Sequence, residues 1–281
     1  NIANIYEKEG SDCWFSDNPQ RFLGEKYKSE DYEKLSDIVE VWFDSGSTHS
    51  FVLEKREDLK WQASMYLEGS DQHRGWFHSS LLESCGTRGK APFESILSHG
   101  FVVDGKGLKM SKSLGNVIAP EDILKKYGAD ILRIWVASSN YAEDLRIDHS
   151  ILDQHADSYR KIRNTFRYLL GNLNDNFEEI ELEKINLSEL PELEKFMLHK
   201  IYSLNENFKN YFDNYDFHNV YKELLNFCTV DLSAFYFDIR KDSLYCDSKD
   251  SKKRKSTIIL LNVILNSLLK WFAPILSFTT E

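Results

Sequence analysis

The pattern of hydrophobic and polar positions divides the chain into three parts. Residues 1–40 are polar and rich in turn-forming residues, so they predict loops with short segments. Residues 39–116 change to short apolar runs, such as 64–67 and 95–103, separated by glycine turns and one helix at 72–85. Strands that alternate with helices indicate a parallel sheet, and hence half of a nucleotide-binding α/β layer.

Two further helices are predicted to close this α/β part. Pro120 suits the first turn of a helix that ends near Tyr127, and a second helix covers residues 129–138. From Ile151 onward, no strand signal has comparable strength. The chain is therefore expected to be α/β first and all-α afterwards.

The second half predicts an antiparallel helical bundle. Asp153 is expected to cap a helix that runs to Leu170, and an acidic stretch at 174–190 follows it. A polar loop at 247–255 precedes the last of three further predicted helices, which cover residues 191–212, 217–239 and 256–271.

The helix that ends near Leu170 has two different faces. One face is basic, with Arg160, Arg163 and Arg167, and the opposite face is apolar, with Tyr159, Ile162, Phe166, Leu169 and Leu173. Such arginines either form an ordinary solvated face or contact a phosphate backbone. The same two readings apply to the basic run at residues 252–255.

Composition narrows the class of protein. The 281 residues carry a net charge of -10, which argues against nucleic-acid binding driven by overall charge. The four cysteines form no Cys-x-x-Cys pair, so we expect a reducing cytoplasm and no structural metal site. The most apolar run, 258–269, is interrupted by Asn262, Asn266 and Ser267, and no membrane span is expected.

A cationic loop at residues 105–116 is the strongest candidate for chemistry. Lys109 and Lys112 lie three residues apart among glycines, and Ser111 and Ser113 add hydroxyl donors beside them. This composition suits polyphosphate binding, although a Lys-x-x-Lys pair in a loop is more often a solvated surface. The residues alone leave both interpretations open.

Residues 65–76 are interpreted as a strand, a tight turn and a helix. Ligands of open α/β sheets bind beyond the carboxyl ends of strands, where Glu68, Gly69 and Asp71 are expected. A carboxylate at this position can accept both hydroxyl protons of a ribose. In the alternative interpretation, Asp71 is a helix N-cap and Glu68 an exposed strand end.

Together these motifs resemble the class I aminoacyl-tRNA synthetases. The lysine loop is similar to the signature loop of that family, and residues 65–76 and 41–48 resemble the adenosine-binding and pocket segments of its isoleucyl members. The match continues through residues 127–130, 135–138 and 273–278.

The resemblance implies specific roles for these residues. Lys109 and Lys112 stabilise the pyrophosphate leaving group, and Ser113 belongs to the same ATP site. Trp42 and Trp76 wall the isoleucine side-chain pocket. Four residues contact the aminoacyl-adenylate, with Asp71 on the ribose: Glu68, Gly69, Asp71 and Gln72.

The resemblance also implies a domain plan and partners. Residues 1–150 form the second half of a Rossmann-like catalytic domain, and residues 151–281 form an incomplete anticodon-binding bundle whose arginine face touches tRNA. The implied reaction joins isoleucine to ATP as isoleucyl-adenylate, with Mg²⁺ accompanying the ATP, and transfers it to tRNA(Ile). The full-length enzyme is expected to be monomeric and cytoplasmic.

The sequence departs from the family pattern in one important respect. No histidine stands in the His-x-Gly-His signature, and no editing domain or zinc-binding tail is present, so we expect an inactive fragment of a longer enzyme. The alternatives are a valyl or leucyl enzyme and a non-catalytic tRNA-binding module. The segment 72–76 favours the isoleucyl type.

Overall fold

The computed structural model describes residues 1–173 and 186–281, and it divides into two compact units. The first unit is Asn1–Leu97 and the second is Ser98–Glu281. The predicted acidic stretch at 174–190 lies mostly outside the described residues. None of the helices in the described part of the chain is long and apolar enough to cross a membrane.

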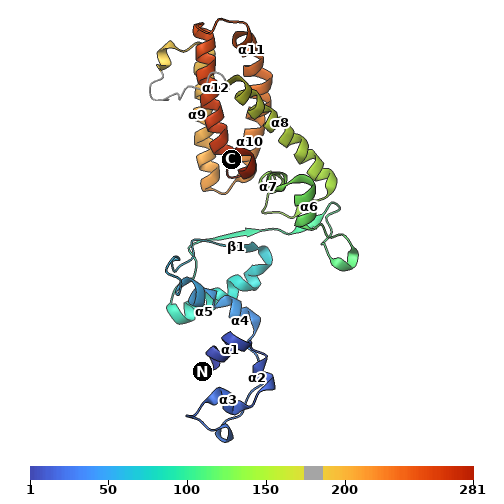
Figure 1. The fold of residues 1–281 in the computed structure, drawn as a ribbon, viewed down its shortest axis with the longest axis vertical. Coiled ribbons are helices and arrows are strands. Elements are labelled where there is room, and N and C mark those ends of the chain that lie inside the picture. The colour runs from blue at the N-terminus through green and yellow to red at the C-terminus, as the bar shows by residue number, and fades with distance from the viewer. Residues whose placement is uncertain (174–185) are drawn as a thin grey trace. The chain divides into compact units, whose positions relative to one another are not determined.

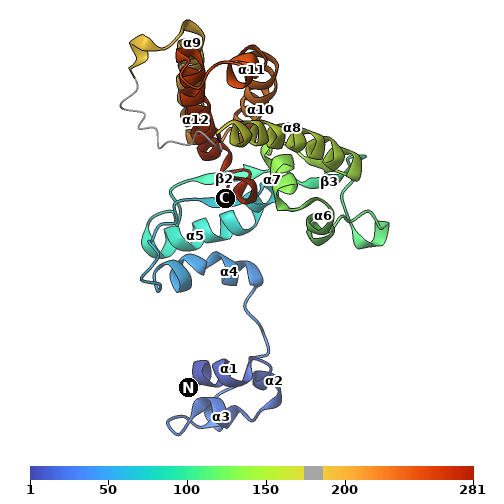
Figure 2. The same ribbon diagram turned by 45° about the horizontal axis from the view of Figure 1, so that its top comes forward.

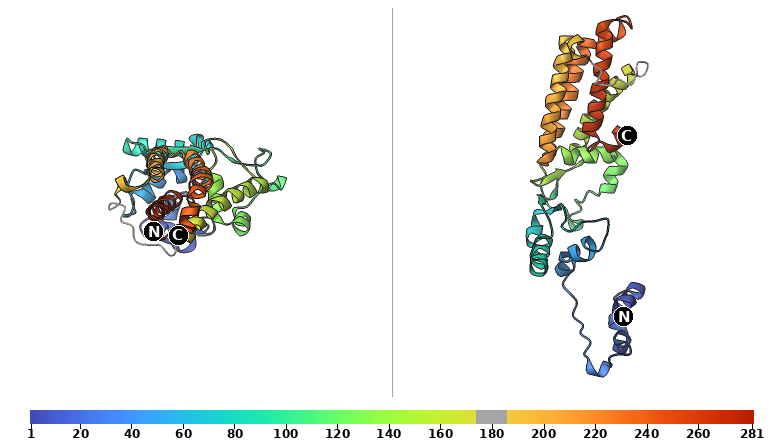
Figure 3. Two further views of the ribbon diagram at one scale, coloured as in Figure 1. Left: turned by 90° about the horizontal axis from the view of Figure 1, so that it is seen from above. Right: turned by 90° about the vertical axis from the view of Figure 1, so that its left-hand side faces the viewer.

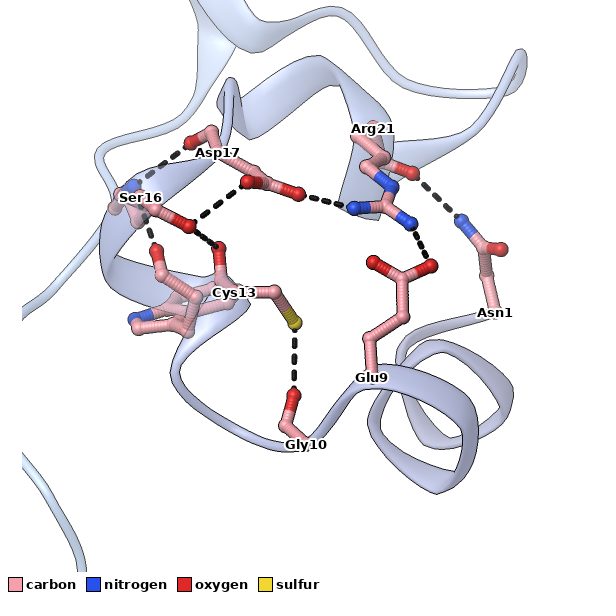
Figure 4. Close-up of polar contacts among 9 residues, drawn as sticks. Asn1, Glu9, Gly10, Cys13, Ser16, Asp17 and Arg21 are labelled. Atoms are coloured by element: carbon pink, nitrogen blue, oxygen red, sulfur yellow. Dashed lines mark hydrogen bonds and ion pairs between the residues drawn. The ribbon is translucent and has the colours of Figure 1, made fainter.

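The N-terminal segment consists of short helices joined by loops, and residues 32–40 are loop, so the prediction of loops for residues 1–40 is right only in part. It contains α1 (Ile2–Glu9), α2 (Cys13–Ser16), α3 (Pro19–Leu23) and the 3₁₀ turn η1 (Ser29–Asp31). The Arg21 guanidinium pairs with the carboxylates of Asp17 and Glu9, and the Cys13 Sγ donates to the Gly10 carbonyl oxygen over 2.9 Å (Figure 4). The Arg21–Asp17 pair has the i,i+4 spacing that supports a helix, and the Arg21–Glu9 pair joins α3 to α1.

The remainder of the first unit follows the predicted alternation of strand and helix. It contains α4 (Val41–Gly46), the π-helical turn η2 (His49–Leu53), β1 (Tyr66–Gly69), the 3₁₀ turn η3 (Ser70–Arg74) and α5 (Trp76–Arg88). The predicted helix at 72–85 therefore begins later, because η3 occupies its first residues. Strand β1 forms a two-stranded sheet with β2 (Ile96–His99). The boundary between the two units falls inside β2, after Leu97.

The second unit contains a small α/β region. Its elements are β3 (Val102–Asp104), the 3₁₀ turn η4 (Lys112–Leu114), α6 (Pro120–Tyr127), α7 (Ala129–Ala137) and β4 (Leu145–Ile147). Strands β3 and β4 pair in parallel, with Val103 opposite Arg146. The predicted apolar run at 95–103 is split into β2 and β3 at Gly100, where a Cβ atom would lie 2.3 Å from the Glu143 carbonyl oxygen.

A helical bundle makes up the rest of the second unit (Figure 1). Helices α9, α10 and α12 lie side by side, and α8 packs against α7 and α12 (Figure 3). This part contains α8 (His149–Leu173), η6 (Leu187–Glu189), α9 (Glu192–Asp213), α10 (Phe217–Asn226), the π-helical η7 (Phe227–Phe237), α11 (Asp238–Tyr245), α12 (Lys252–Phe272) and α13 (Ser277–Thr280). The predicted fold class, α/β followed by a helical bundle, is confirmed.

The bundle core contains one buried ionic group. Most of the core is apolar, with residues such as Leu169, Met197 and Leu224 fully buried. Within it, the Glu194 carboxylate accepts from Arg240 Nε and Nη2, both over 2.7 Å, and from the Tyr236 hydroxyl over 3.0 Å. Every carboxylate oxygen is thereby paired, as burial of a charge requires.

Two predicted boundaries in the second half are wrong. The cap of α8 is Asp148 rather than Asp153: its Oδ1 accepts from the Ile151 amide over 2.8 Å, while Asp153 accepts from the Tyr127 hydroxyl. The predicted loop at 247–255 ends early, because α12 begins at Lys252 with Ser251 as its cap. The basic run at 252–255 is therefore the first turn of a helix.

Candidate active site

The strand-turn-helix of the first unit places the predicted adenylate-binding residues in one short segment. Glu68 and Gly69 are the last residues of β1, as expected, and Asp71 and Gln72 belong to η3. Gln72 Oε1 accepts from the Trp76 amide over 2.9 Å, and Asp71 Oδ2 accepts from Gln72 Nε2 over 3.2 Å. Gly75 occupies the N-cap of α5, so the alternative role of Asp71 as a cap is wrong.

The two predicted pocket tryptophans lie on the same part of the first unit. Trp76 stacks on Tyr66 with ring centroids 4.1 Å apart, and its Nε1 donates to the Ser45 carbonyl oxygen over 2.9 Å. The Trp42 ring packs so closely on Gly75 that a Cβ atom there would lie 2.9 Å from it. With 46% of its surface exposed, Trp42 offers an apolar wall. The role of both residues in amino-acid binding stays a prediction.

The lysine loop leaves β3 and returns to the unit at α6 (Figure 2). A tight turn begins it, with Gly107 at φ +83°, and the amide of Asp104 donates to the Leu108 carbonyl oxygen over 2.9 Å. Ser111 then caps η4 by accepting from the Leu114 amide over 3.3 Å. The side chain of Met110 packs on the small core of α6, α7, β4 and α8.

Both signature lysines are exposed on this loop. Lys109 precedes η4 and Lys112 opens it, and neither ammonium group has an ion-pair partner within residues 1–173 and 186–281. Ser113 Oγ lies 3.1 Å from Ser111 Oγ. Exposed ammonium groups without an ion-pair partner among the described residues fit both an anionic ligand and a solvated surface, so the role of the two lysines stays a prediction.

Sequence reasoning missed the residues that close the loop. The Asn116 side chain donates to Asp104 Oδ2 over 2.8 Å and accepts from the Ser111 amide over 2.9 Å. A cavity of about 530 Å³ lies beside this contact, lined by Asp104, Gly105, Lys106, Leu108, Leu114, Asn116 and Asp148. Asn116 could have been singled out from the sequence, since it ends the Leu-Gly-Asn segment that directly follows the lysines of the loop.

The basic face of α8 has the predicted form. Ile162, Phe166 and Leu169 are buried in the bundle core, and the arginines at 160, 163 and 167 are all exposed. Arg160 pairs with Asp157, three residues earlier. The two-faced helix is thus confirmed, while contact of its arginines with tRNA stays a prediction.

Among the described residues, no group of three His, Cys, Asp or Glu side chains could hold a metal ion. Cys13 and Cys228 are buried, whereas Cys85 and Cys246 are exposed, and all four are free thiols. Burial raises the pKa of the Cys228 thiol to about 12. None of these thiols is therefore given a role as a metal ligand.

The strand-turn-helix, the lysine loop and the helical bundle are together typical of a class I tRNA synthetase. Residues 1–148 match the family model "tRNA synthetases class I (I, L, M and V)", and residues 194–281 match "Anticodon-binding domain of tRNA ligase". The chain belongs to the class I tRNA synthetases of this I, L, M and V group.

Within that group, the similar curated proteins are isoleucine–tRNA ligases. The chain is 84% identical over all 281 residues to the isoleucine–tRNA ligase of Pelagibacter ubique (strain HTCC1062), and it covers 31% of that protein. It is 52% identical to the isoleucine–tRNA ligase of Brucella abortus (strain 2308), of which it covers 28%. The chain thus spans about a third of the length of these relatives, and the predicted resemblance to the isoleucyl type is confirmed.

Solved structures share the fold at low sequence identity. The chain matches LeuRS in a LeuRS–tRNA–LeuAMS ternary complex from Agrobacterium radiobacter K84 with a TM-score of 0.67 and 16% identity, covering 88% of this chain and 31% of LeuRS. It also matches methionyl-tRNA synthetase from Mycobacterium tuberculosis in complex with methionyl-adenylate, with a TM-score of 0.68 and 20% identity. This match covers 85% of this chain and 48% of that synthetase.

Proposed function

We propose that this chain supplies the lysine loop, the adenylate-binding segment and part of the anticodon-binding bundle of an isoleucine–tRNA ligase. The observation that carries this proposal is the 84% identity to such a ligase along the whole chain. The same similarity disfavours the valyl and leucyl alternatives, and the lysine loop and the adenylate-binding segment disfavour a module without catalytic residues.

The proposed reaction is attack of an isoleucine carboxylate oxygen on the α-phosphorus of ATP. The bond from that phosphorus to the bridging oxygen breaks, and pyrophosphate leaves with the negative charge. Lys109 and Lys112 neutralise that charge, because their exposed ammonium groups are unpaired within the described residues. Mg²⁺ enters with the ATP, as a divalent cation bound to its phosphates.

The first unit is proposed to hold the adenylate. Asp71 accepts hydroxyl protons of the ribose, and Glu68, Gly69 and Gln72 line the same end of β1. Trp42 and Trp76 shape an apolar slot for the isoleucine side chain.

The second unit is proposed to receive tRNA(Ile) on the arginine face of α8. Three exposed guanidinium groups on one helix face suit a phosphate backbone, even though the chain has a net charge of -10. We further propose that residues 1–150 act as catalytic domain and 151–281 as anticodon-binding domain of a monomeric, cytoplasmic enzyme.

A chimera tests this proposal directly. These 281 residues replace the corresponding part of the Pelagibacter ubique ligase, and ATP–pyrophosphate exchange is measured with isoleucine, valine and leucine. We expect exchange with isoleucine at a rate within about tenfold of the parent ligase, and charging of tRNA(Ile). A correctly folded chimera without isoleucine-dependent exchange, or one that prefers leucine, would overturn the proposal.

A further inference from the structure

One side chain closes the lysine loop at both ends. Asn116 Nδ2 donates to Asp104 Oδ2 over 2.8 Å and to the Lys109 carbonyl oxygen over 3.3 Å, while its Oδ1 accepts from the Ser111 amide over 2.9 Å. These bonds join the last residue of β3 to the loop backbone on either side of Met110. An amide can donate and accept at the same time, which a carboxylate or an aliphatic side chain cannot do.

Asp104 provides the fixed end of this contact. Its Oδ1 accepts from the amides of Lys106 and Leu108, over 3.0 and 2.8 Å, and thereby orders the turn that precedes the lysines. The hydrogen bonds from Asn116 and from the Leu108 amide lower the pKa of Asp104, so the carboxylate is ionised at neutral pH. Strand β3 is in turn anchored by its parallel neighbour β4.

We infer that Asp104 and Asn116 are positioning residues that hold the lysine loop in the geometry needed to stabilise the leaving pyrophosphate. This inference rests on the proposed function of the loop. Asn116 acts through the backbone of Lys109 and Ser111, and Asp104 acts through Asn116.

Glycines at 105, 107 and 115 give the backbone of this loop many alternative conformations. Holding the lysines in one position therefore needs contacts that offset the loss of backbone conformational entropy. Electrostatic stabilisation of a transition state depends on charges that are already oriented, and a displacement of about 1 Å can lower a rate by roughly 100-fold. The Asp104–Asn116 contact, with the packing of Met110, is the feature of the described structure that fixes both sides of the lysine pair.

A reciprocal exchange tests the inference in the chimera. Asn116→Asp places two carboxylates against each other at the 2.8 Å contact. Asp104→Asn places two amide NH₂ groups against each other, because the side-chain oxygen at position 104 stays bound to the backbone amides of Lys106 and Leu108. The double variant restores one donor and one acceptor. It loses the weaker bond to the Lys109 carbonyl oxygen, which then faces a carboxylate oxygen, so the recovery is expected to be partial.

The readout is the single-turnover rate of adenylate formation per active site, with active sites counted by burst titration. We expect each single variant to lower this rate about 10- to 100-fold with the KM for isoleucine within about twofold, and the double variant to recover at least half of the loss on a logarithmic scale. Single variants with an unchanged rate per active site would overturn the inference. Single variants that lower only the number of active sites, and not the rate per site, would also overturn the inference. So would a double variant whose loss of rate equals the product of the two single losses.

A matched pair elsewhere provides the control. Asn219 Nδ2 donates to Asp216 Oδ2 over 2.7 Å at the start of α10, and the same exchanges are made there. They are expected to leave the rate per active site unchanged. An unaltered chimera without exchange overturns the proposed function, and this inference with it. An active chimera that is inhibited by Lys112→Ala but not by the single variants overturns this inference alone.

Discussion

The guanidinium group of Arg133 on α7 donates from Nε to the carbonyl oxygen of Ile275 over 2.8 Å and from Nη2 to that of Pro274 over 2.6 Å. One turn earlier, the buried Asp130 accepts from the Thr279 hydroxyl over 2.5 Å and from the Phe278 amide over 3.3 Å. Helix α7 thereby holds the end of the described chain at four points. These contacts tie the C-terminal segment of the second unit to α7.

Asp130→Ala is expected to destabilise the second unit by about 1–3 kcal/mol. The substitution leaves a hydroxyl and an amide without their buried acceptor. Urea unfolding of the 281-residue chain measures the effect. The exposed Asp153, substituted in the same way, is the control and is expected to cost less than about 1 kcal/mol. Equal losses from both would contradict a specific role for the α7 contacts.

Glu194→Gln is expected to cost about 3–5 kcal/mol, because it leaves the buried Arg240 charge without its counterion. Replacing both residues by apolar ones of similar size, Glu194→Leu with Arg240→Met, should cost much less. Chemical denaturation of the single and the double variant gives the comparison. The exposed pair of Lys241 and Asp238 serves as control, where Asp238→Ala changes stability by about 1 kcal/mol or less.

Cys228 is expected to resist alkylation in the folded chain. Burial raises its pKa from 9.0 to about 12, so the thiol is protonated at pH 8. Because the unfolded thiol ionises first, the stability it contributes is complete below pH 9 and is lost as the pH rises toward 12. Mass spectrometry after iodoacetamide treatment at pH 8 should find labels on Cys85 and Cys246. Rapid labelling of Cys228 under native conditions would contradict its burial.

Replacing Arg160, Arg163 and Arg167 by glutamine in the chimera is expected to weaken tRNA binding and to flatten its salt dependence. Removing one guanidinium that neutralises a phosphate should reduce the slope of log K against log salt by roughly 0.7–0.9. Since Arg160 already pairs with Asp157, we expect its substitution to reduce this slope the least of the three. A matched variant removes three lysines on other helices, the half-buried Lys195 and the exposed Lys209 and Lys241, and should keep the slope. Equal slopes in both variants would remove the arginine face from the tRNA site.

Several elements could be predicted from sequence because a local pattern determines them. Pro120 and Tyr127 bound α6 as expected, since proline suits a first turn and Gly128 follows at φ +84°. The buried face of α8 follows from its periodicity. The end of β1 at Gly69 is likewise visible from the turn chemistry that follows it.

Other features depend on contacts that a local pattern does not contain. The segment predicted as one helix at 217–239 includes η7, because an extra residue per turn leaves no clear mark on an apolar sequence. Basic residues oppose the dipole at a helix start, so the sequence predicts a loop at Lys252, although the Ser251 cap allows the helix to begin there. Asp104 and Asn116 are twelve positions apart in the sequence, a separation at which local spacing predicts no contact.

The most direct measurement for the central claim is ATP–pyrophosphate exchange by the chimera with Lys112→Ala, compared with Lys106→Ala as a matched control on the same loop. If Lys112 stabilises the leaving pyrophosphate, its loss should lower exchange roughly 100- to 1,000-fold while isoleucine binding changes less than about threefold. Lys106→Ala should retain exchange within about threefold of the unaltered chimera. Equal losses of exchange and isoleucine binding, or equal effects of the two substitutions, would contradict the proposed role of the lysine loop.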